Sequence, residues 1–141
     1  MITEEKCLIV DLDGTLCPEK RPDQEYAELP VYEPMRQKLL AYQAEGYTII
    51  IQTARTMRTH GGNVGRITAK TAKITIDWLD RHGIPYDELH FGKPWNGRGG
   101  FYIDDNAIRP REFLELTPAE IQARLKADKD LSGYKPDRMA S

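Results

Sequence analysis

A short apolar run near the start of the chain leads directly into two acidic residues, and this feature most constrains the fold. The segment "KCLIVD" (6–11) is apolar and partly β-branched, which is typical of a strand covered on both faces. It ends in Asp11, and Asp13 and Gly14 follow at once. Two carboxylates this close repel one another, so the pattern requires either a bound cation or a proton on one carboxyl.

The rest of the chain alternates between strand-like and helix-like patterns. The expected strands are 6–11, 47–53, 88–91 and 99–104, and the expected helices are 33–46, 67–82 and a final one over about 117–130. Pro34 suits the first turn of a helix and Gly46 its end, while Thr117 and Glu120 form a capping-box pattern. This order of segments predicts an α/β fold with a mostly parallel sheet.

The composition limits the classes of function. The chain has 141 residues, 40% of them apolar and 30% charged, which fits a single domain over 1–141. Its net charge of −2 predicts no nucleic-acid partner, and the lack of an 18-residue apolar run predicts no membrane partner. We expect no signal peptide, and we expect Cys7 and Cys17 to be free thiols in the cytoplasm.

Residues that suit phosphate chemistry follow the ends of all four expected strands. They are Asp11, Asp13, Thr53, Lys93, Asp104 and Asp105. Because the carboxyl ends of parallel strands meet at one edge of a sheet, we expect these side chains in one crevice. Four carboxylates together need a cation, and a set of oxygen ligands suits Mg²⁺. One carboxylate can then attack phosphorus to form an aspartyl-phosphate, while a second protonates the leaving oxygen.

The stretch from Asp11 to Leu16, "DLDGTL", resembles the first motif of the haloacid dehalogenase (HAD) superfamily. The positions of Thr53, Lys93 and the pair Asp104-Asp105 are similar in order and rough spacing to its second, third and fourth motifs. The resemblance implies that Asp11 is the nucleophile and Asp13 the general acid and base. The implied metal ligands are Asp11, Asp13, Asp104 and Asp105, the last of them either directly or through water. The implied fold is a Rossmann-like three-layer sandwich with a mostly parallel central sheet.

A narrower resemblance covers most of the chain. Residues 55–67, 91–110 and 116–121 are similar to the small HAD phosphatases encoded in capsular-polysaccharide biosynthesis clusters. This resemblance implies a Mg²⁺-dependent phosphatase that acts on a small phosphorylated metabolite, such as a sugar or polyol phosphate. The spacing between the motifs leaves no room for a cap domain. We therefore expect a capless member that covers its site by forming a homo-oligomer.

Two segments are expected to border the site: a flap over 14–34 and a substrate loop over 54–66. The candidate substrate-binding residues of this loop are Arg55, Arg58, Asn63 and Arg66. Arginine can hold a phosphate or carboxylate in bidentate fashion, so a cationic rim suits an anionic substrate. His60 and Trp95 fit the same rim, but they fit ordinary surface and packing roles as well.

Three alternative functions differ in class from a metabolite phosphatase. An open site would also admit a nucleic-acid 3′ end, whose phosphates the arginines could contact. An aspartyl-phosphate could pass its phosphoryl group to an alcohol, which would make the protein a phosphotransferase. A receiver-type switch needs its phosphoacceptor on a strand in mid-chain, but the expected strand 47–53 ends in Gln52-Thr53.

Overall fold

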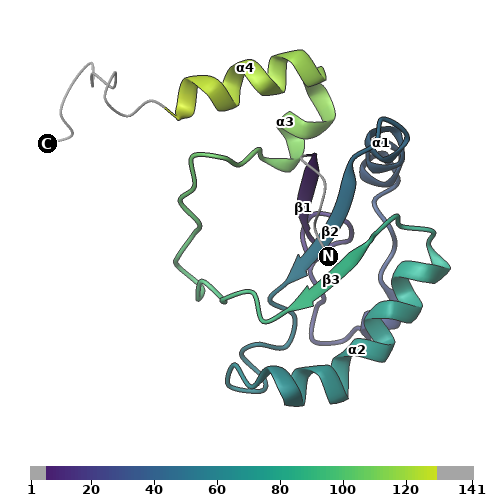
Figure 1. The fold of residues 1–141 in the computed structure, drawn as a ribbon. Helices are drawn as coiled ribbons and strands as arrows, with labels where there is room; N and C mark the ends of the chain where they lie inside the picture. The colour runs from purple at the N-terminus through teal and green to yellow at the C-terminus, as the bar shows by residue number, and fades with distance from the viewer. Residues whose placement is uncertain (1–5, 130–141) are drawn as a thin grey trace, which may run out of the picture. The chain divides into compact units, whose positions relative to one another are not determined.

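The computed structural model describes residues 6–129 of the chain. These residues belong to two compact units, the first ending at Arg98 and the second beginning at Gly99 (Figure 1). Within residues 6–129, none of the helices has the length and apolar content of a membrane-spanning segment.

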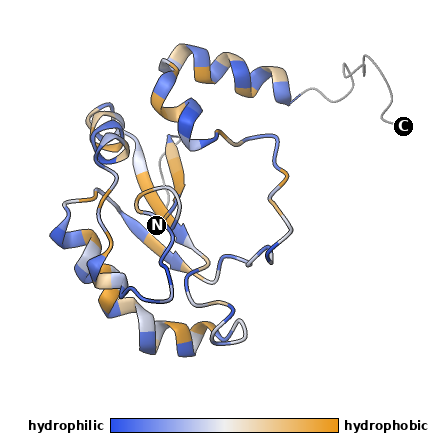
Figure 2. Ribbon diagram, turned by 180° about the vertical axis from the view of Figure 1, so that it is seen from behind, coloured by the Kyte–Doolittle hydropathy of each residue, from blue (hydrophilic) through white to orange (hydrophobic). Residues whose placement is uncertain are grey.

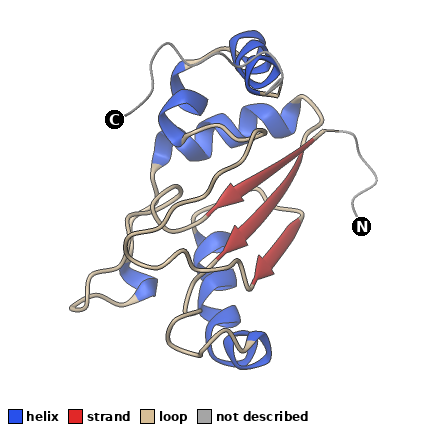
Figure 3. Ribbon diagram, turned by 90° about the vertical axis from the view of Figure 1, so that its left-hand side faces the viewer, coloured by secondary structure: helices blue, strands red, loops and turns tan. Residues whose placement is uncertain are grey.

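The first unit is built on a three-stranded parallel sheet. Its strands are β1 (Cys7–Asp11), β2 (Thr48–Thr53) and β3 (Glu88–Phe91), in the order β1-β2-β3. All three arrows point the same way in Figure 3. The register pairs Asp11 with Gln52, and Thr53 with Phe91, so the carboxyl ends of the strands form one edge. These three strands and the α/β class are confirmed.

Two helices connect the strands. Helix α1 (Glu33–Ala44) has a proline in its first turn, as expected, and contacts β2. Helix α2 (Val64–Arg81) contacts β3 and begins three residues before the predicted start, because the Asn63 side chain caps it. Its amphipathic pattern shows in Figure 2 as alternating blue and orange bands. The two crossovers advance in the same direction across the sheet, and the right-handed rule for such connections places both helices over one face.

The segment between β1 and α1 contributes to the core of the first unit. It contains a short 3₁₀ helix, η1 (Tyr26–Glu28), and buries Leu12, Leu16 and Leu29 at 1% exposure or less. The indole nitrogen of Trp78 on α2 donates a hydrogen bond of 2.7 Å to the Leu29 carbonyl. The predicted flap is therefore anchored against α2 through its second half.

The second unit contains helices α3 (Pro110–Glu115) and α4 (Pro118–Asp128). The predicted capping box at the start of α4 is confirmed, with Thr117 and Glu120 each accepting from the other's backbone amide. Helix α3 had no predicted counterpart, and the end predicted for α4 near residue 130 lies outside the described residues.

The predicted strand over 99–104 is wrong for the described structure, which assigns no helix or strand to residues 99–109. The segment has the composition of a strand, but a strand forms only where a neighbour accepts its backbone hydrogen bonds. Its apolar side chains are exposed instead: Phe101 at 77%, Tyr102 at 53% and Ile103 at 90%.

Candidate active site

The carboxyl edge of the sheet brings together residues from three distant parts of the sequence. Asp11 ends β1, Thr53 ends β2, and Lys93 follows β3 by two residues. The Lys93 ammonium lies 3.3 Å from Asp11 Oδ1, and the Lys93 amide donates a 3.1 Å hydrogen bond to the Thr53 carbonyl. The sequence prediction that these three residues meet is therefore matched by direct contacts.

A glycine places Lys93 at this edge. Gly92 has a φ of 90°, in the left-handed region that favours glycine. A Cβ atom at this position would also lie only 3.0 Å from Val64 Cγ2 at the start of α2. Backbone freedom and lack of a side chain at Gly92 thus allow the chain to turn from β3 toward Asp11.

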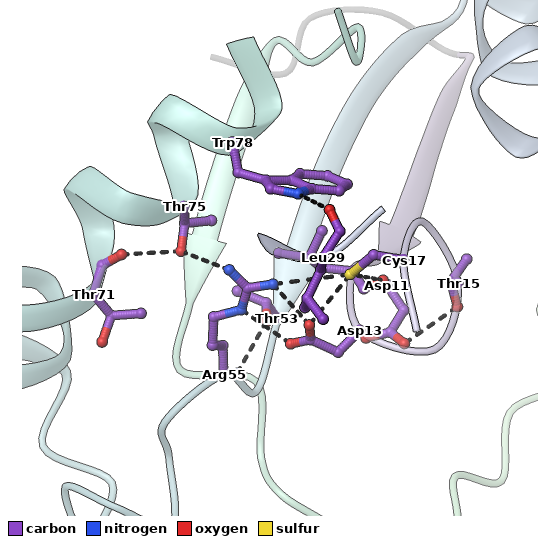
Figure 4. A network of polar contacts seen from close by, with 11 residues as sticks. Asp11, Asp13, Thr15, Cys17, Leu29, Thr53, Arg55, Thr71, Thr75 and Trp78 are labelled. Atoms are coloured by element: carbon purple, nitrogen blue, oxygen red, sulfur yellow. Dashed lines mark hydrogen bonds and ion pairs between the residues drawn. The ribbon is translucent and has the colours of Figure 1, made fainter. Parts of the chain in front are cut away.

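The turn after β1 holds the Asp11 carboxylate from its other side. Gly14, with a φ of 88°, donates to the Cys17 carbonyl at 2.7 Å. This turn places the Thr15 hydroxyl 3.3 Å from Asp11 Oδ2, as Figure 4 shows. Asp11 therefore has one oxygen facing Lys93 and the other facing Thr15, while 36% of its side chain stays exposed.

Asp13 is held by Arg55, the second residue after β2. Arg55 donates from Nη2 to Asp13 Oδ1 at 2.7 Å and from Nε to Asp13 Oδ2 at 3.1 Å (Figure 4). The Arg55 side chain is 1% exposed and that of Asp13 is 21% exposed. Bidentate geometry in a buried setting fixes the orientation of the Asp13 carboxylate.

The Arg55 guanidinium is itself held by helix α2 and by η1. Its Nη1 donates to the Thr75 hydroxyl at 3.2 Å, and Thr75 donates in turn to the Thr71 carbonyl at 2.9 Å. The Tyr26 ring lies 4.1 Å from the guanidinium carbon, which is a cation–π distance. Two elements of the first unit, α2 and η1, thus hold the Arg55 side chain against Asp13.

Backbone strain accompanies this arrangement in the loop after β2. Thr56 has a φ of 58°, which is unfavourable for a β-branched residue, and it directly follows Arg55. The Thr56 hydroxyl lies 2.9 Å from the Thr71 hydroxyl. This hydrogen bond links the loop to α2 and offsets part of the backbone strain at Thr56.

Cys17 and Tyr26 border Asp13 and are neutral at physiological pH. Burial, together with the charge of Asp13, raises the pKa of the Cys17 thiol to about 12. The thiol donates to Asp13 Oδ1 at 3.4 Å. Burial is also the main cause that raises the pKa of Tyr26, and Asp13 adds to it. Neither group brings a further negative charge to the site.

The four predicted substrate-binding residues have different surroundings. Arg58 and Arg66 are exposed, and the Arg58 guanidinium lies 5.6 Å from the ring of Trp95. The Asn63 side chain accepts the Arg66 amide as the N-cap of α2. Arg55 is buried and directs its guanidinium at Asp13 and Thr75 rather than at the rim.

The four carboxylates of the predicted magnesium site are divided between the two units. Asp11 and Asp13 belong to the first, and Asp104 and Asp105 belong to the second, where both are exposed. Asp104 Oδ1 accepts the Asn106 amide at 2.8 Å. Within residues 6–129, no group of three or more His, Cys, Asp or Glu side chains is arranged to hold a metal ion. Neither unit by itself therefore forms the predicted site.

The sequence did not predict the residues that contact Asp13 or hold its partner Arg55 in place. These residues are Cys17, Tyr26, Thr71 and Thr75. A signal for the last two exists in the sequence. Thr71 and Thr75 lie one turn apart on the buried side of α2, which they share with Ile67 and Trp78. Two hydroxyl groups on an apolar helix face indicate a buried polar partner.

Comparison with known proteins finds a strong match among the solved structures. A Vibrio cholerae protein of known crystal structure is 46% identical, with a TM-score of 0.83, and the match covers 88% of this chain and 99% of that chain. Two structures of a Pnkp1/Rnl/Hen1 complex, one of them described as an RNA repair complex, are 25% and 24% identical. Their TM-scores are 0.47 and 0.46, and the matches cover only 36% and 31% of those chains. No protein-family model and no curated protein matches the chain.

Proposed function

We propose that this chain, which belongs to the same family as the Vibrio cholerae protein, is a HAD-type phosphatase that hydrolyses a small phosphorylated metabolite. The observation that carries the proposal is the contact between Asp11 and Lys93. These residues are 82 positions apart, yet their charged groups lie 3.3 Å from one another at the carboxyl edge of the sheet. A carboxylate that is partly exposed and faces a lysine suits nucleophilic attack on an anionic phosphoryl group.

In the first step, an Asp11 oxygen attacks the phosphorus atom and the bond to the leaving alcohol breaks. Asp13 gives its proton to the alcohol oxygen, so a neutral alcohol departs and Asp11 carries the phosphoryl group. Lys93 balances the charge on the phosphoryl oxygens. The Thr53 hydroxyl accepts the Arg55 amide at 3.0 Å and keeps its own proton for a hydrogen bond to one of those oxygens.

In the second step, water attacks the same phosphorus atom. Asp13 now accepts a proton from that water, the Asp11–phosphate bond breaks, and inorganic phosphate leaves. Between the two steps Asp13 is a carboxylate, which is the form that the two hydrogen bonds from Arg55 stabilise.

A Mg²⁺ ion would complete the charge balance of this site. Its ligands would be Asp11, Asp13 through its main-chain oxygen, Asp104, and Asp105 directly or through water. When bound, such an ion neutralises phosphoryl charge and orients the phosphate toward the nucleophile. The oxygen-only character of this donor set fits magnesium, and the set requires residues of both units.

The exposed pair Arg58 and Trp95 favours a sugar or polyol phosphate as substrate. Trp95 is 46% exposed, and an indole face packs well against the apolar face of a sugar ring. The Arg58 guanidinium lies at a cation–π distance from the Trp95 ring and would bind an anionic group of the same substrate. This pairing is consistent with a role in surface or capsular polysaccharide biosynthesis.

A screen of phosphorylated metabolites tests the proposal, with release of inorganic phosphate as the readout. We expect turnover with added Mg²⁺ and none after chelation by EDTA. Asp11→Asn is expected to abolish turnover because an amide does not attack phosphorus, and Asp13→Asn to reduce it by about 10²- to 10⁴-fold. Asp23→Asn serves as the matched control, since Asp23 is an exposed carboxylate paired only with Arg21 among the described contacts.

Two arms of the screen distinguish the alternatives. A 3′-phosphorylated oligonucleotide that is hydrolysed faster than every sugar phosphate would favour a nucleic-acid end phosphatase. Added alcohols that reduce phosphate release while forming new phosphate esters would favour a phosphotransferase. Metal-independent hydrolysis, or full activity of Asp11→Asn, would refute the proposed mechanism.

A further inference from the structure

We propose that Thr75, a buried residue of α2, positions Asp13 for proton transfer by fixing the guanidinium group of Arg55. The inference rests on the proposed function, because it concerns the carboxyl group that protonates the leaving alcohol there. Thr75 acts on Asp13 through Arg55, so it is a positioning residue and not a catalytic one. All three residues belong to the first unit.

The Thr75 hydroxyl lies on an apolar helix face and is oriented as an acceptor. Thr75 is fully buried and shares its side of α2 with Ile67 and Trp78. Its hydroxyl has one proton, which it donates to the Thr71 carbonyl at 2.9 Å. Its lone pairs are therefore left to accept from Arg55 Nη1, at 3.2 Å (Figure 4).

The Arg55 guanidinium transmits this position to Asp13. The group is planar and rigid, so the place of one nitrogen determines the places of the other two. Thr75 holds Nη1, while Nη2 and Nε donate to Asp13 Oδ1 and Oδ2 at 2.7 and 3.1 Å. The Tyr26 ring lies 4.1 Å from the guanidinium carbon, but a ring face attracts the cation whichever way its nitrogens point. The hydrogen bond to Thr75 thus sets the direction in which Arg55 faces Asp13.

The orientation of the Asp13 carboxyl group is important because its two oxygens are not equivalent. Oδ1 accepts from Arg55 Nη2 and from the Cys17 thiol at 3.4 Å, whereas Oδ2 accepts from Arg55 Nε. Each carboxyl oxygen has about two lone-pair sites, so Oδ2 keeps a site for the proton that passes to the leaving oxygen. General acid catalysis requires this oxygen within hydrogen-bond reach of the leaving atom. A carboxyl group that turned with a loosened Arg55 would lose that reach.

A loss of stability alone does not distinguish positioning from a structural role, since any buried donor left unpaired lowers stability. The nature of the leaving group does distinguish them. An alkoxide is a poor leaving group and needs the proton, whereas p-nitrophenolate departs without one. The parameter kcat/KM covers the steps up to departure of the leaving group. A defect in the position of the acid therefore lowers kcat/KM for an alkyl phosphate selectively.

Two substrates test this expectation in the full chain: an alkyl phosphate that is hydrolysed in the metabolite screen, and p-nitrophenyl phosphate. Thr75→Val keeps the shape of the side chain and removes its hydroxyl. It should lower kcat/KM by about 10- to 100-fold for the alkyl phosphate and by less than about 3-fold for p-nitrophenyl phosphate. Thr75→Ser keeps the hydroxyl and should restore both values.

Thr71→Val is the matched control. It removes another buried threonine hydroxyl from the same side of α2, but that hydroxyl contacts Thr56 and not Arg55. It keeps the Thr71 carbonyl that orients Thr75. We expect it to change the two kcat/KM values by the same factor. Equal losses on the two substrates for Thr75→Val, under conditions where the variant is folded, would overturn the positioning role.

NMR of ¹⁵N-labelled protein tests the contact without any activity. In the wild type, the Arg55 Nε–H group donates to Asp13 in a buried setting, so its signal should be protected from exchange with water. Thr75→Val should lose this protection and Thr75→Ser should keep it. Should the valine variant not fold, Thr75→Ala takes its place in both tests, because it also lacks the hydroxyl and leaves room for a water molecule.

The two readouts separate the two proposals. Loss of protection in Thr75→Val, together with a wild type that hydrolyses no phosphate ester, would keep the role of Thr75 in orienting Asp13 and refute the function. Full protection in Thr75→Val, together with an active wild type, would overturn the positioning role and leave the function intact.

Discussion

Replacing Arg55 with methionine should destabilise the first unit strongly, because Asp13 would lose its buried counter-ion. The pair is joined by hydrogen bonds of 2.7 and 3.1 Å, with side-chain exposures of 1% for Arg55 and 21% for Asp13. Removing one partner of a buried pair costs about 3–5 kcal/mol, and the partial exposure of Asp13 favours the lower end. The lost contact with Tyr26 adds about 0.5–1 kcal/mol.

Urea denaturation followed by tryptophan fluorescence measures this loss. Trp78 is fully buried on the face of α2 that also carries Thr71 and Thr75, so its fluorescence reports on unfolding. With a denaturant slope of about 1–3 kcal/mol/M, a loss of about 3–4 kcal/mol should move the midpoint down by about 1–4 M. Arg66→Met, at an exposed arginine, is the matched control and should change the unfolding free energy by less than about 0.5 kcal/mol.

A double-mutant cycle with Asp13→Asn shows whether the loss comes from the pair. If it does, the double variant should be destabilised by clearly less than the sum of the single variants. A loss below about 1 kcal/mol for Arg55→Met, or strict additivity in the cycle, would refute the conclusion that this ion pair anchors the loop after β2.

The remaining predictions concern the edge of the sheet and the buried thiol. Lys93→Met should lower kcat of the proposed reaction by about 10²-fold or more with a smaller change in the free energy of unfolding, as steady-state kinetics and urea melts would show. Gly92→Ala should lower both activity and stability, because its φ of 90° is strained for alanine and the new Cβ would lie 3.0 Å from Val64; normal values for both would contradict this. The folded-state pKa of Cys17 is raised from 9.0 to about 12, so its neutral thiol stabilises the fold below pH 9.0 and this contribution is lost as pH rises toward 12. The difference in Tm between wild type and Cys17→Ala should therefore shift against the wild type over that range, and a constant difference would contradict the assignment.

The residues at the carboxyl edge of the sheet could be predicted from the sequence, because the parallel direction of the strands largely determines which residues meet there. Asp11, Thr53 and Lys93 each follow an apolar run, and parallel strands bring their ends together whatever the details of packing. The start of α4 was equally predictable, since the capping box at Thr117 is a local pattern.

The partner of Asp13 could not be predicted, because it depends on packing between distant elements. The sequence predicts that Arg55 binds substrate at the rim of the site; the substrate contact stays a prediction, but the guanidinium is directed at Asp13. The structure shows a guanidinium fixed by Thr75 on α2 and by Tyr26 on η1, which no local pattern specifies. For the same reason, the strand propensity of 99–104 did not indicate which edge, if any, would accept it.

The measurement that tests the central claim most directly is the capture of a phosphorylated enzyme. Asp13→Asn should slow hydrolysis of the intermediate, so rapid acid quenching of this variant with a substrate found in the screen should allow the phosphoryl group to be located by mass spectrometry. We predict that it lies on Asp11. A phosphoryl group on another residue, or turnover of substrate with no covalent intermediate at any quench time, would contradict the account.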